Sequence, residues 1–524
     1  MKNEQFRSLD RFLEKEEYPL WLVLNHHKTH TNRYLTLDKH QYLKEILMDK
    51  SRFRVYKKST QGGVSEVLIV ISWSAAVKGN TIFYMLPTHG LMKRFVTNRY
   101  EKSLSYTRYY QEHKSDSKSQ SLSKEMIDNQ TLKDIGAGVI AFAGSRSEVP
   151  LVEIPADWLI VDELAKCDAD NVEMAKERLG HASDPHMIYV GNPSYIGDAL
   201  DEKWDQSTKS RWHIQGECGH WNKLNFFDHI VEKIGEQDYV IRDPDYDAEL
   251  DKDIRPICSV CGKPFDRYSE GEYVDEGSAI FSGKHISRLF SGTGTIREIV
   301  NNFSAGLVND VRMQRVYNSD FGESYTSAGS KLTYEMLDEL REDYIMPDTS
   351  KMNCVAGIDV GGLLHIHIAE VLSSDLLRTV YLGEVSGGYE EIITLFRAYN
   401  VKFFVIDSMP EIRLARKLVN SWTGCDCNVN SKNREFSFNR QTKTISQIRT
   451  AFLDNVKENV LLRKILLPKN ARKIPNYYDQ MTNSVRVFDE DKEEYSWIHG
   501  SKPDHYMFAT GYMLLAKRMY LTVR

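Results

Sequence analysis

The sequence predicts an α/β protein with at least two domains, each built around its own buried sheet. Between about residues 35 and 195, short apolar runs alternate with helical patterns, which is typical of a parallel sheet covered on both faces. A second series of apolar strands begins near residue 354, and an acidic segment between the two series holds three of the seven cysteines. We therefore expect an α/β domain at 1–205, a cysteine-containing insertion at 206–275, a helical remainder and linker at 276–346, and a second α/β domain at 347–524.

Composition agrees with a globular chain and excludes several classes of protein. The 524 residues are 41% hydrophobic and 27% charged, with a net charge of −6, so any contact with nucleic acid must come from local basic patches. The first residues lack the apolar core of a secretory signal, and no stretch approaches the length of a membrane span. We expect neither a signal peptide nor a membrane segment.

The first strand of the N-terminal domain ends in a loop rich in glycine, and this loop opens a helix. It reads Lys57, Lys58, Ser59, Thr60, Gln61, Gly62, Gly63, Val64 and Ser65. A phosphate-binding loop holds phosphate oxygens with backbone amides and a lysine, and holds magnesium with a Ser or Thr hydroxyl. Ser65 stands in the hydroxyl position, but the usual lysine is missing. A lysine at the front of the loop can reach the same phosphate, so we favour Lys58, with Lys57 as the alternative.

An acidic pair follows a second apolar strand of this domain, 158–161. Asp162 and Glu163 come directly after four apolar residues, where unpartnered carboxylates would be costly to desolvate. With a phosphate loop upstream, Asp162 would hold magnesium through water and Glu163 would orient or deprotonate the attacking water. The two motifs together predict an ATPase.

Polar residues next to these motifs complete the predicted nucleotide site. Asn192 and Ser194 follow the next strand, where they could sense the γ-phosphate and couple hydrolysis to movement. Gln41 precedes the first helix of the domain and could read adenine through its amide, or it could be a surface glutamine.

The insertion carries a candidate zinc site. Cys258 and Cys261 form a CxxC knuckle, and Cys218 is followed by Gly219 and His220. Zinc takes four nitrogen or sulfur ligands in a tetrahedron, so His220 is the expected fourth ligand and His213 is the alternative. Such a closed site would help to fold the module and would not be catalytic.

Three aspartates in the C-terminal domain are placed like the ligands of a second metal centre. Asp359 and Asp407 each end a buried strand (354–358 and 402–406), and Asp504 precedes the closing helix at 507–519. Carboxylates that converge from two strands and a helix start suit two-metal phosphodiester cleavage. His505 could bind metal, shuttle a proton or cap the helix.

These motifs, in this order, resemble the large terminase subunit of tailed bacteriophages, closest to the lambda-type branch, over nearly the whole chain. The resemblance rests on the glutamine, the loop with its lysine at the front, the acidic pair, the Gly191-Asn192-Pro193-Ser194 turn, and Trp204 with residues 207–212 leading into the cysteine knuckle. It implies an ASCE-type P-loop ATPase domain and an RNase H-like nuclease domain, with metals held by Asp359, Asp407 and Asp504.

One position departs from the family's pattern. The family often has an arginine about ten residues before the acidic pair, which completes a neighbouring subunit's site. Here that stretch is 151–154, without arginine, and Arg146 is the substitute that the sequence offers.

The resemblance also implies the function and the partners. We expect ATP hydrolysis to drive double-stranded DNA into a procapsid and a two-metal endonuclease to cut concatemeric DNA. The implied cofactors are ATP, Mg²⁺ (or Mn²⁺) and Zn²⁺. The implied partners are a portal protein, a small terminase subunit and further copies of this chain in a ring, taken as a pentamer. The protein would work in the host cytoplasm, attach transiently to the portal, and be absent from the mature virion.

Two other functions fit some of the same residues. A helicase-nuclease of DNA repair or phage defence would need a second nucleotide-binding domain between the ATPase and the nuclease. A non-catalytic scaffold would explain the missing loop lysine, but the intact Ser65, Asp162 and Glu163 argue against it.

Overall fold

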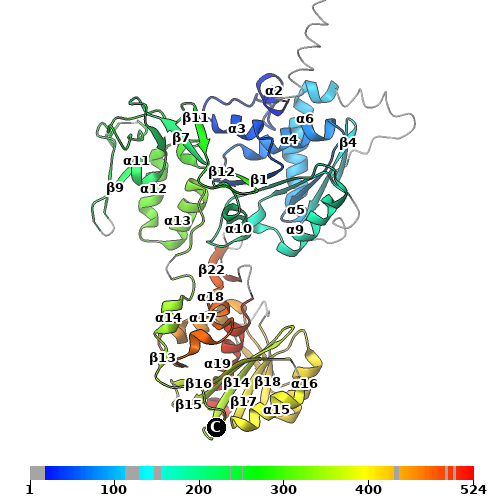
Figure 1. Cartoon of the computed structure of the whole chain (residues 1–524), viewed down its shortest axis with the longest axis vertical. Helices are drawn as coiled ribbons and strands as arrows, with labels where there is room; N and C mark the ends of the chain where they lie inside the picture. Colours follow the sequence, from blue (N-terminus) through cyan, green and yellow to red (C-terminus); the bar gives the residue numbers. More distant parts are fainter. Residues whose placement is uncertain are drawn as a thin grey trace, which may run out of the picture. The chain divides into compact units, whose positions relative to one another are not determined.

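The computed structural model describes residues 18–112, 129–146, 155–235, 238–250, 252–327, 329–386, 388–429, 436–489, 494–499 and 503–523. The chain forms two compact units, Met1–Tyr325 and Thr326–Arg524 (Figure 1). The sequence places the start of the second domain at 347, whereas the structure divides the chain at 325/326. The reason is that Leu332, Leu337 and Leu340 are buried in the core of the C-terminal unit.

The N-terminal unit is built on a seven-stranded sheet that is parallel except for one edge strand, as the alternating pattern predicts. Strand β6 lies between β1, which leads into the phosphate loop, and β5, which ends in the acidic pair. In order across the sheet, the strands are β12 (Ser282–Ile286), β1 (Phe53–Lys58), β6 (His186–Gly191), β5 (Trp158–Asp162), β2 (Thr81–Leu86), β4 (Gly138–Gly144) and β3 (Leu132–Ile135), of which β3 is antiparallel.

Successive side chains of each strand enter opposite faces of this sheet, and each face has its own core. On one face Tyr56, Tyr84 and Ile160 join the core that includes α2 (Tyr18–Asn25), α3 (Tyr42–Met48) and α4 (Val64–Val77). On the other face Val55 and Val161 pack with α9 (Ala169–Lys176) and α10 (Ala199–Asp205). The remaining helical segments around the sheet are α5 (His89–Phe95), the π-helix η1 (Val96–Tyr100), α6 (Glu101–Tyr106), η2 (Leu164–Lys166) and η3 (Glu177–His181).

Helix α4 is buried along nearly its whole length, as expected for a helix that is hydrophobic all round. It begins directly after the phosphate loop, so the loop stands on one of the most deeply buried elements of the unit.

The insertion forms small sheets beside the large one, and the chain then returns to it through β12. These segments are β7 (Arg211–Gln215), β8 (Trp221–Lys223), α11 (Phe226–His229), β9 (Val231–Lys233), β10 (Tyr239–Ile241) and β11 (Gly271–Val274). After β12 come η4 (Arg288–Phe290), α12 (Ile296–Gly306), α13 (Asp310–Arg315) and the π-helix η5 (Val316–Phe321). The described residues between β6 and the C-terminal unit therefore form small sheets, helices and one strand of the seven-stranded sheet. They do not form a second parallel-sheet domain.

The C-terminal unit is built on a nine-stranded mixed sheet with the order β13-β21-β16-β15-β14-β17-β18-β20-β19. Its centre is a hairpin of β14 and β15, followed by β16, with β17 and β18 parallel to β14 on the other side. The bounds are β13 (Arg341–Glu342), β14 (Cys354–Val360), β15 (Leu364–Val371), β16 (Leu377–Val385), β17 (Val401–Asp407), β18 (Gly424–Asn428), β19 (Ser437–Asn439), β20 (Thr444–Ser446) and β21 (Ile465–Pro468), beside the hairpin of β22 (Ser484–Asp489) and β23 (Glu494–His499).

Helices cover both faces of this sheet, and the closing helix α19 (His505–Val523) crosses β14 at very short range. A Cβ atom at Gly357 would lie 2.1 Å from the carbonyl oxygen of Ala509 and 2.1 Å from the backbone nitrogen of Met513, so only glycine allows this approach. The other helical segments are α14 (Tyr334–Asp338), α15 (Tyr389–Ala398), α16 (Ile412–Ser421), α17 (Arg449–Leu461), η6 (Ala471–Lys473) and α18 (Tyr477–Thr482). No helix in the described parts of the chain is long and apolar enough to span a membrane.

A buried histidine ties α19 to the sheet. His367 of β15 is fully buried, with Nδ1 2.9 Å from the hydroxyl of Thr510 and Nε2 2.9 Å from that of Thr379. Burial lowers the pKa of His367 to about 3. An unfolded chain protonates histidine near pH 6.5, so the unfolded state binds more protons than the folded state below that pH.

We predict that His367 makes the protein less stable as pH falls from 6.5 toward 3, by up to about 1.4 kcal/mol per pH unit. Between pH 7 and 5.5, wild type should lose about 1 kcal/mol more unfolding free energy than His367→Gln. Urea unfolding of the full chain measures this difference. The same exchange at exposed His89 should keep the wild-type pH dependence, and equal losses in wild type and His367→Gln would contradict the assignment.

Candidate active sites

The predicted phosphate loop lies between β1 and α4, in a conformation that its glycines permit. Gly63, at the start of α4, has φ of 76°, and Gln61 has φ of 58°, both in the left-handed region. The buried hydroxyl of Tyr42 donates a 3.0 Å hydrogen bond to the carbonyl of Gly62. Ser65 lies half-buried in the first turn of α4.

The two lysines at the front of the loop have different partners. Lys58 Nζ lies 2.7 Å from Glu163 Oε1, whereas Lys57 Nζ lies 2.8 Å from Asp201 Oδ1, on α10. Sequence reasoning left the choice open between Lys57 and Lys58. In the structure only the Lys58 ammonium, of these two, reaches the acidic pair.

The acidic pair lies at the carboxyl end of β5, on the same sheet edge as the phosphate loop. Asp162 is 2% exposed and accepts hydrogen bonds from the hydroxyl of Tyr84 (3.1 Å) and the backbone amide of Glu163 (3.0 Å). Burial raises the pKa of Asp162. Burial by itself would also raise the pKa of Glu163. The nearby Lys58 ammonium has the larger opposite effect, so the pKa of Glu163 is lowered.

Glu163 has φ of 59°, a left-handed conformation that costs energy for a residue with a side chain. Backbone strain of this kind persists where neighbouring structure enforces it, often at functional sites.

The residues predicted for coupling lie at the end of β6, between the loop and the acidic pair. The end of the Asn192 side chain faces two backbone carbonyl oxygens. When the amide is oriented with its nitrogen toward these acceptors, it donates to the carbonyls of Lys58 (3.1 Å) and Asn318 (2.5 Å). The carbonyl of Ser194 accepts hydrogen bonds from the side chain of Asn318 (2.7 Å) and the backbone of Tyr325 (3.1 Å). Asn318 and Tyr84 were missed from sequence, because neither belongs to a local motif.

Two further residues are predicted for the nucleotide site, Gln41 and Arg146. Gln41 directly precedes α3, whose residues Tyr42 and Leu43 lie against the loop glycines. Arg146 is exposed after β4, and the stretch 151–154, where the family's pattern expects an arginine, lies outside the described residues.

In the insertion, three thiols gather into one cluster. The ligand atoms of Cys218, Cys258 and Cys261 all lie within 4.8 Å of one another. Burial would raise the pKa of Cys258, but backbone amides of Cys261 and Val260 outweigh it and lower it to about 7. Thiolates are strong zinc ligands, so the donor set fits the ion. The predicted fourth ligand, His220, lies beside this cluster, with Nε2 3.5 Å from Ser259 Oγ, but it is not among the ligand atoms that converge. The alternative, His213, has Nδ1 2.9 Å from the carbonyl oxygen of Arg211.

In the C-terminal unit, Asp359 and Asp407 end neighbouring parallel strands, as predicted. Burial raises the pKa of both carboxyls, that of Asp407 to about 6, and nearby acids add to the effect: Asp504 acts on Asp359, and Asp359 acts on Asp407. Asp504 accepts a 2.7 Å hydrogen bond from Ser484 and lies 3.3 Å from Arg449.

The structure adds His365 and Glu384, which sequence reasoning missed, to this centre. Ligand atoms of Asp359, His365 and His505 lie within 4.8 Å of one another, and His505 Nδ1 is 2.7 Å from Asp359 Oδ2. His365 also lies 3.3 Å from Glu384. In the strand register, His365 lies directly opposite Asp359 on β14 and opposite Glu384 on β16. This register is the signal that would have identified His365 and Glu384.

The chain thus combines a unit with a parallel-rich sheet, in which a glycine loop lies beside an acidic pair, with a mixed-sheet unit that holds a cluster of acids and histidines. Residues 42–277 match the family described as phage terminase large subunit gpA, ATPase domain. The matched residues all lie within the N-terminal unit, so this unit is similar to the ATPase domain of that family.

Solved structures extend the likeness to the fold of the whole chain. The large terminase of bacteriophage HK97 is similar over 95% of this chain and 99% of its own, at 9% identity and a TM-score of 0.52. A large terminase from a thermophilic bacteriophage matches at 11% identity over 96% of this chain and 98% of its own, with a TM-score of 0.30. The large terminase nuclease of thermophilic phage G20c matches at 14% identity over 36% of this chain and 90% of its own, with a TM-score of 0.24. No curated protein matches the chain. The chain therefore shares its fold with the large terminase of bacteriophage HK97.

Proposed function

We propose that this protein is the motor and the nuclease of a DNA-packaging machine of the lambda-type branch. Its N-terminal unit hydrolyses ATP to move double-stranded DNA into a procapsid, and its C-terminal unit cuts concatemeric DNA to begin and end packaging. The observation that carries the proposal is the contact of Lys58 with Glu163 beside Asp162, inside the region that matches the terminase ATPase family.

In the ATPase site, the loop amides and the Lys58 ammonium hold the phosphates of ATP, and the amide of Gln41 reads adenine. Asp162 and the Ser65 hydroxyl offer oxygen donors, which suit Mg²⁺, and this ion neutralises phosphate charge when bound. When Lys58 turns toward the phosphates, the Glu163 carboxylate is released to take a proton from the attacking water. Asn192 and Ser194 report this change to the rest of the unit.

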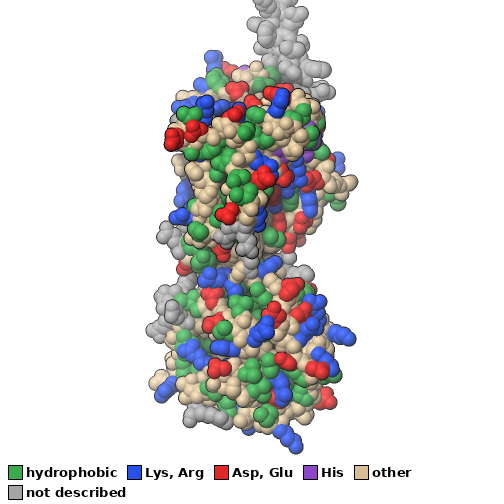
Figure 2. All heavy atoms as spheres, turned by 90° about the vertical axis from the view of Figure 1, so that its left-hand side faces the viewer, with side chains coloured by type: hydrophobic (Ala, Val, Ile, Leu, Met, Phe, Trp, Pro, Cys, Tyr) green, Lys and Arg blue, Asp and Glu red, His purple; other side chains and the backbone are tan. Residues whose placement is uncertain are grey.

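The assembly is a ring of identical chains on the portal, in which a neighbour's Arg146 completes each ATPase site. A pentamer, a small terminase subunit and transient work in the host cytoplasm belong to the same proposal. Figure 2 shows basic side chains interspersed with acidic ones on the face that it draws.

In the C-terminal unit, Asp359, Asp407 and Asp504 hold two divalent ions, either Mg²⁺ or Mn²⁺. The support is the strand order β16-β15-β14-β17-β18, in which three antiparallel strands are followed by two parallel ones, with acids at the ends of the adjacent strands β14 and β17. This arrangement supports our proposal that the C-terminal unit is an RNase H-like nuclease domain of the large-terminase type. Bound ions supply an activated water and stabilise the leaving oxygen. His505, hydrogen-bonded to Asp359, can move a proton at this centre.

In the insertion, Cys218, Cys258 and Cys261 hold a structural zinc ion. His220, which borders the cluster, completes the tetrahedron. The ion ties the segment after β7 to the later CxxC turn and so stabilises the small sheets of the insertion.

We predict that Glu163→Gln lowers ATP turnover by at least about 100-fold, because the site loses its general base. ATP binding, measured with a fluorescent analogue, should persist because the loop and Lys58 are unchanged. Glu173→Gln on the surface of α9 is the matched control and should hydrolyse ATP like wild type. Wild-type turnover in Glu163→Gln would refute the assigned role.

We predict that Asp359→Asn abolishes metal-dependent DNA cleavage while ATP turnover stays within about twofold of wild type, since the two sites lie in separate units. Mn²⁺ binding, followed by electron paramagnetic resonance, should weaken in parallel. Asp375→Asn, at an exposed position, should leave both properties intact. Persistent cleavage with unchanged Mn²⁺ binding would exclude Asp359 from the centre.

We predict about one zinc ion per chain in the purified full-length protein, by elemental analysis. Cys258→Ser should remove the ion and lower the thermal stability of the insertion, whereas Cys167→Ser, outside the cluster, should retain it. A folded wild-type protein that contains no zinc would overturn the assignment.

A further inference from the structure

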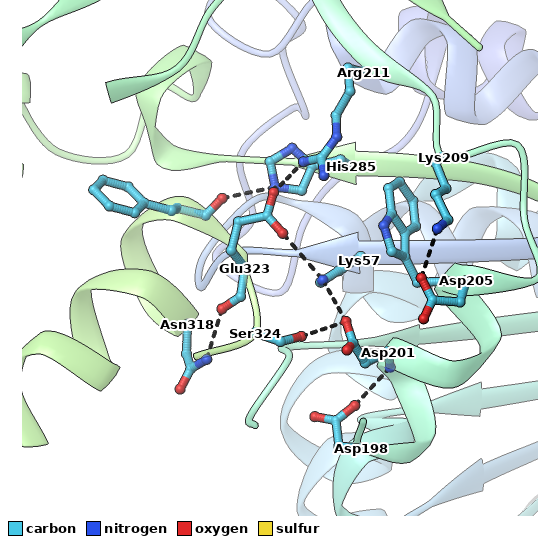
Figure 3. Close-up of polar contacts among 12 residues, drawn as sticks. Lys57, Asp198, Asp201, Asp205, Lys209, Arg211, His285, Asn318, Glu323 and Ser324 are labelled. Atoms are coloured by element: carbon cyan, nitrogen blue, oxygen red, sulfur yellow. Dashed lines mark hydrogen bonds and ion pairs between the residues drawn. The ribbon is translucent and has the colours of Figure 1, made fainter. Parts of the chain in front are cut away.

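A buried cluster of charged side chains surrounds Lys57 (Figure 3). It lies on the face of the sheet opposite to the one where Lys58 contacts Glu163, because consecutive strand residues face opposite sides. The nucleotide chemistry proposed above does not use this cluster. At its centre, Lys57 Nζ lies 2.8 Å from Asp201 Oδ1 and 3.2 Å from Glu323 Oε2. Glu323 also pairs with Arg211 and lies 3.3 Å from His285 Nε2. Lys57 is 3% exposed, so it depends on these partners for the charge contacts that water would otherwise supply.

The cluster fastens a segment of the chain, residues 318–325, to the ATPase sheet. Ser324 Oγ donates a 2.7 Å hydrogen bond to the same Asp201 oxygen that Lys57 contacts. On the neighbouring strand β12, His285 Nε2 lies 2.9 Å from the carbonyl oxygen of Phe321. Asp201 on α10 and Glu323 in the segment are therefore held together by a single ammonium group from β1.

The same segment lies directly on the phosphate loop. The backbone nitrogen and the hydroxyl of Thr60 donate to the carbonyl of Ser319 at 3.0 and 3.1 Å. A Cβ atom at Gly322 would lie 2.5 Å from the Ile286 carbonyl and 2.8 Å from the Ser59 nitrogen, so the backbones are in close contact. A shift of the loop must therefore be accommodated by this segment.

The acidic pair reaches the segment through one side chain. The Asn192 amide touches the carbonyls of Lys58 and Asn318, and the backbone of Asn192 faces the Glu163 carboxylate. Asn318 passes the contact on, since its side chain donates to the carbonyls of Ser194 (2.7 Å) and Glu323 (2.8 Å). The acidic pair, where we propose that ATP is hydrolysed, is thus joined to the Lys57 cluster by a short chain of hydrogen bonds.

Segment 318–325 leads directly into the C-terminal unit. Tyr325 is the last residue of the N-terminal unit, and Thr326 is the first of the C-terminal unit. A cavity of about 290 Å³, lined by Arg211, His285, Glu323 and aromatic side chains, lies next to the cluster and leaves room for Glu323 to move.

We propose that Lys57 is a positioning residue that couples ATP turnover to the chain entering the nuclease unit: it clamps Asp201 to Glu323 and so holds segment 318–325 on the phosphate loop. This inference rests on the proposed ATPase function and deepens it. When ATP draws Lys58 away from Glu163, the Lys58 carbonyl and Asn192 shift with it. Lys57, the adjacent residue of the same strand, transmits the shift to Glu323 and the segment.

The test compares Lys57→Met with Lys209→Met, measured on the full chain. Lys209 pairs with Asp205 at 2.7 Å, close to α10 but in an exposed position, so it is a matched lysine–aspartate control. Amide hydrogen exchange of residues 318–325 is recorded with and without a non-hydrolysable ATP analogue. ATP kcat and KM and the rate of DNA packaging are measured in parallel.

We expect Lys57→Met to abolish the nucleotide-dependent change in exchange and to lower packaging at least about tenfold, while the KM for ATP changes less than threefold. Lys57→Arg, which keeps the charge, should restore both, and Lys209→Met should behave like wild type. Should Lys57→Met fail to fold, Asp201→Asn, which breaks one side of the clamp, should give the same loss of coupling.

Three results separate the ways in which the inference can fail. If Lys57→Met raises the KM for ATP as strongly as Lys58→Met, Lys57 is a phosphate ligand and the inference is wrong. If exchange and packaging in Lys57→Met and Asp201→Asn match wild type, the clamp has no coupling role. If wild type itself neither binds nor hydrolyses ATP, the proposed function fails before the clamp is tested.

Discussion

Consecutive residues of a β-strand must face opposite sides of their sheet, and this constraint organises the N-terminal unit around Lys57 and Lys58. Both ammonium groups are buried, and a buried charge is tolerated only beside a partner of opposite sign. Lys58 contacts Glu163 at the carboxyl edge of the sheet, and Lys57 contacts Asp201 and Glu323 on the other face. Two adjacent lysines that look equivalent in the sequence therefore have different acidic partners.

The same edge concentrates features that would be costly elsewhere in the protein. Asp162 is almost completely buried, and Glu163 adopts a left-handed backbone conformation. Their surroundings keep both in place: Tyr84 and the Glu163 amide satisfy Asp162, and Lys58 satisfies Glu163. Such over-determined, locally unfavourable geometry is expected where a site must present charge to a substrate. In the C-terminal unit, Gly357 has a comparable role, because it lets α19 approach β14 and brings His505 to Asp359.

Much of the fold could be predicted because the signals are local. Apolar runs followed by glycine or acidic residues identified the strands that lead to Gly63, Asp162, Asp359 and Asp407, and the structure has strands at each place. The cysteine spacing likewise identified Cys218, Cys258 and Cys261, whose ligand atoms do converge. The boundary between the two units could not be found this way. Leu332 and Leu337 belong to the C-terminal core through contacts distant in sequence, and no local pattern records such contacts.

The sequence by itself determined which residue types were available: a phosphate loop without its usual lysine, an acidic pair, a thiol cluster and strand-end aspartates. Only the tertiary structure decided which of the two lysines reaches the acidic pair, because that depends on which face of the sheet each one enters and on what packs there. It also brought His365 and Glu384 to the acids of the C-terminal unit, and Asn318 and Glu323 to the phosphate loop. Some of these contacts, such as those of Lys57 with Glu323 and of Thr60 with Ser319, join residues far apart in the sequence. Their pairing follows from strand register and helix packing, which are properties of the folded chain as a whole.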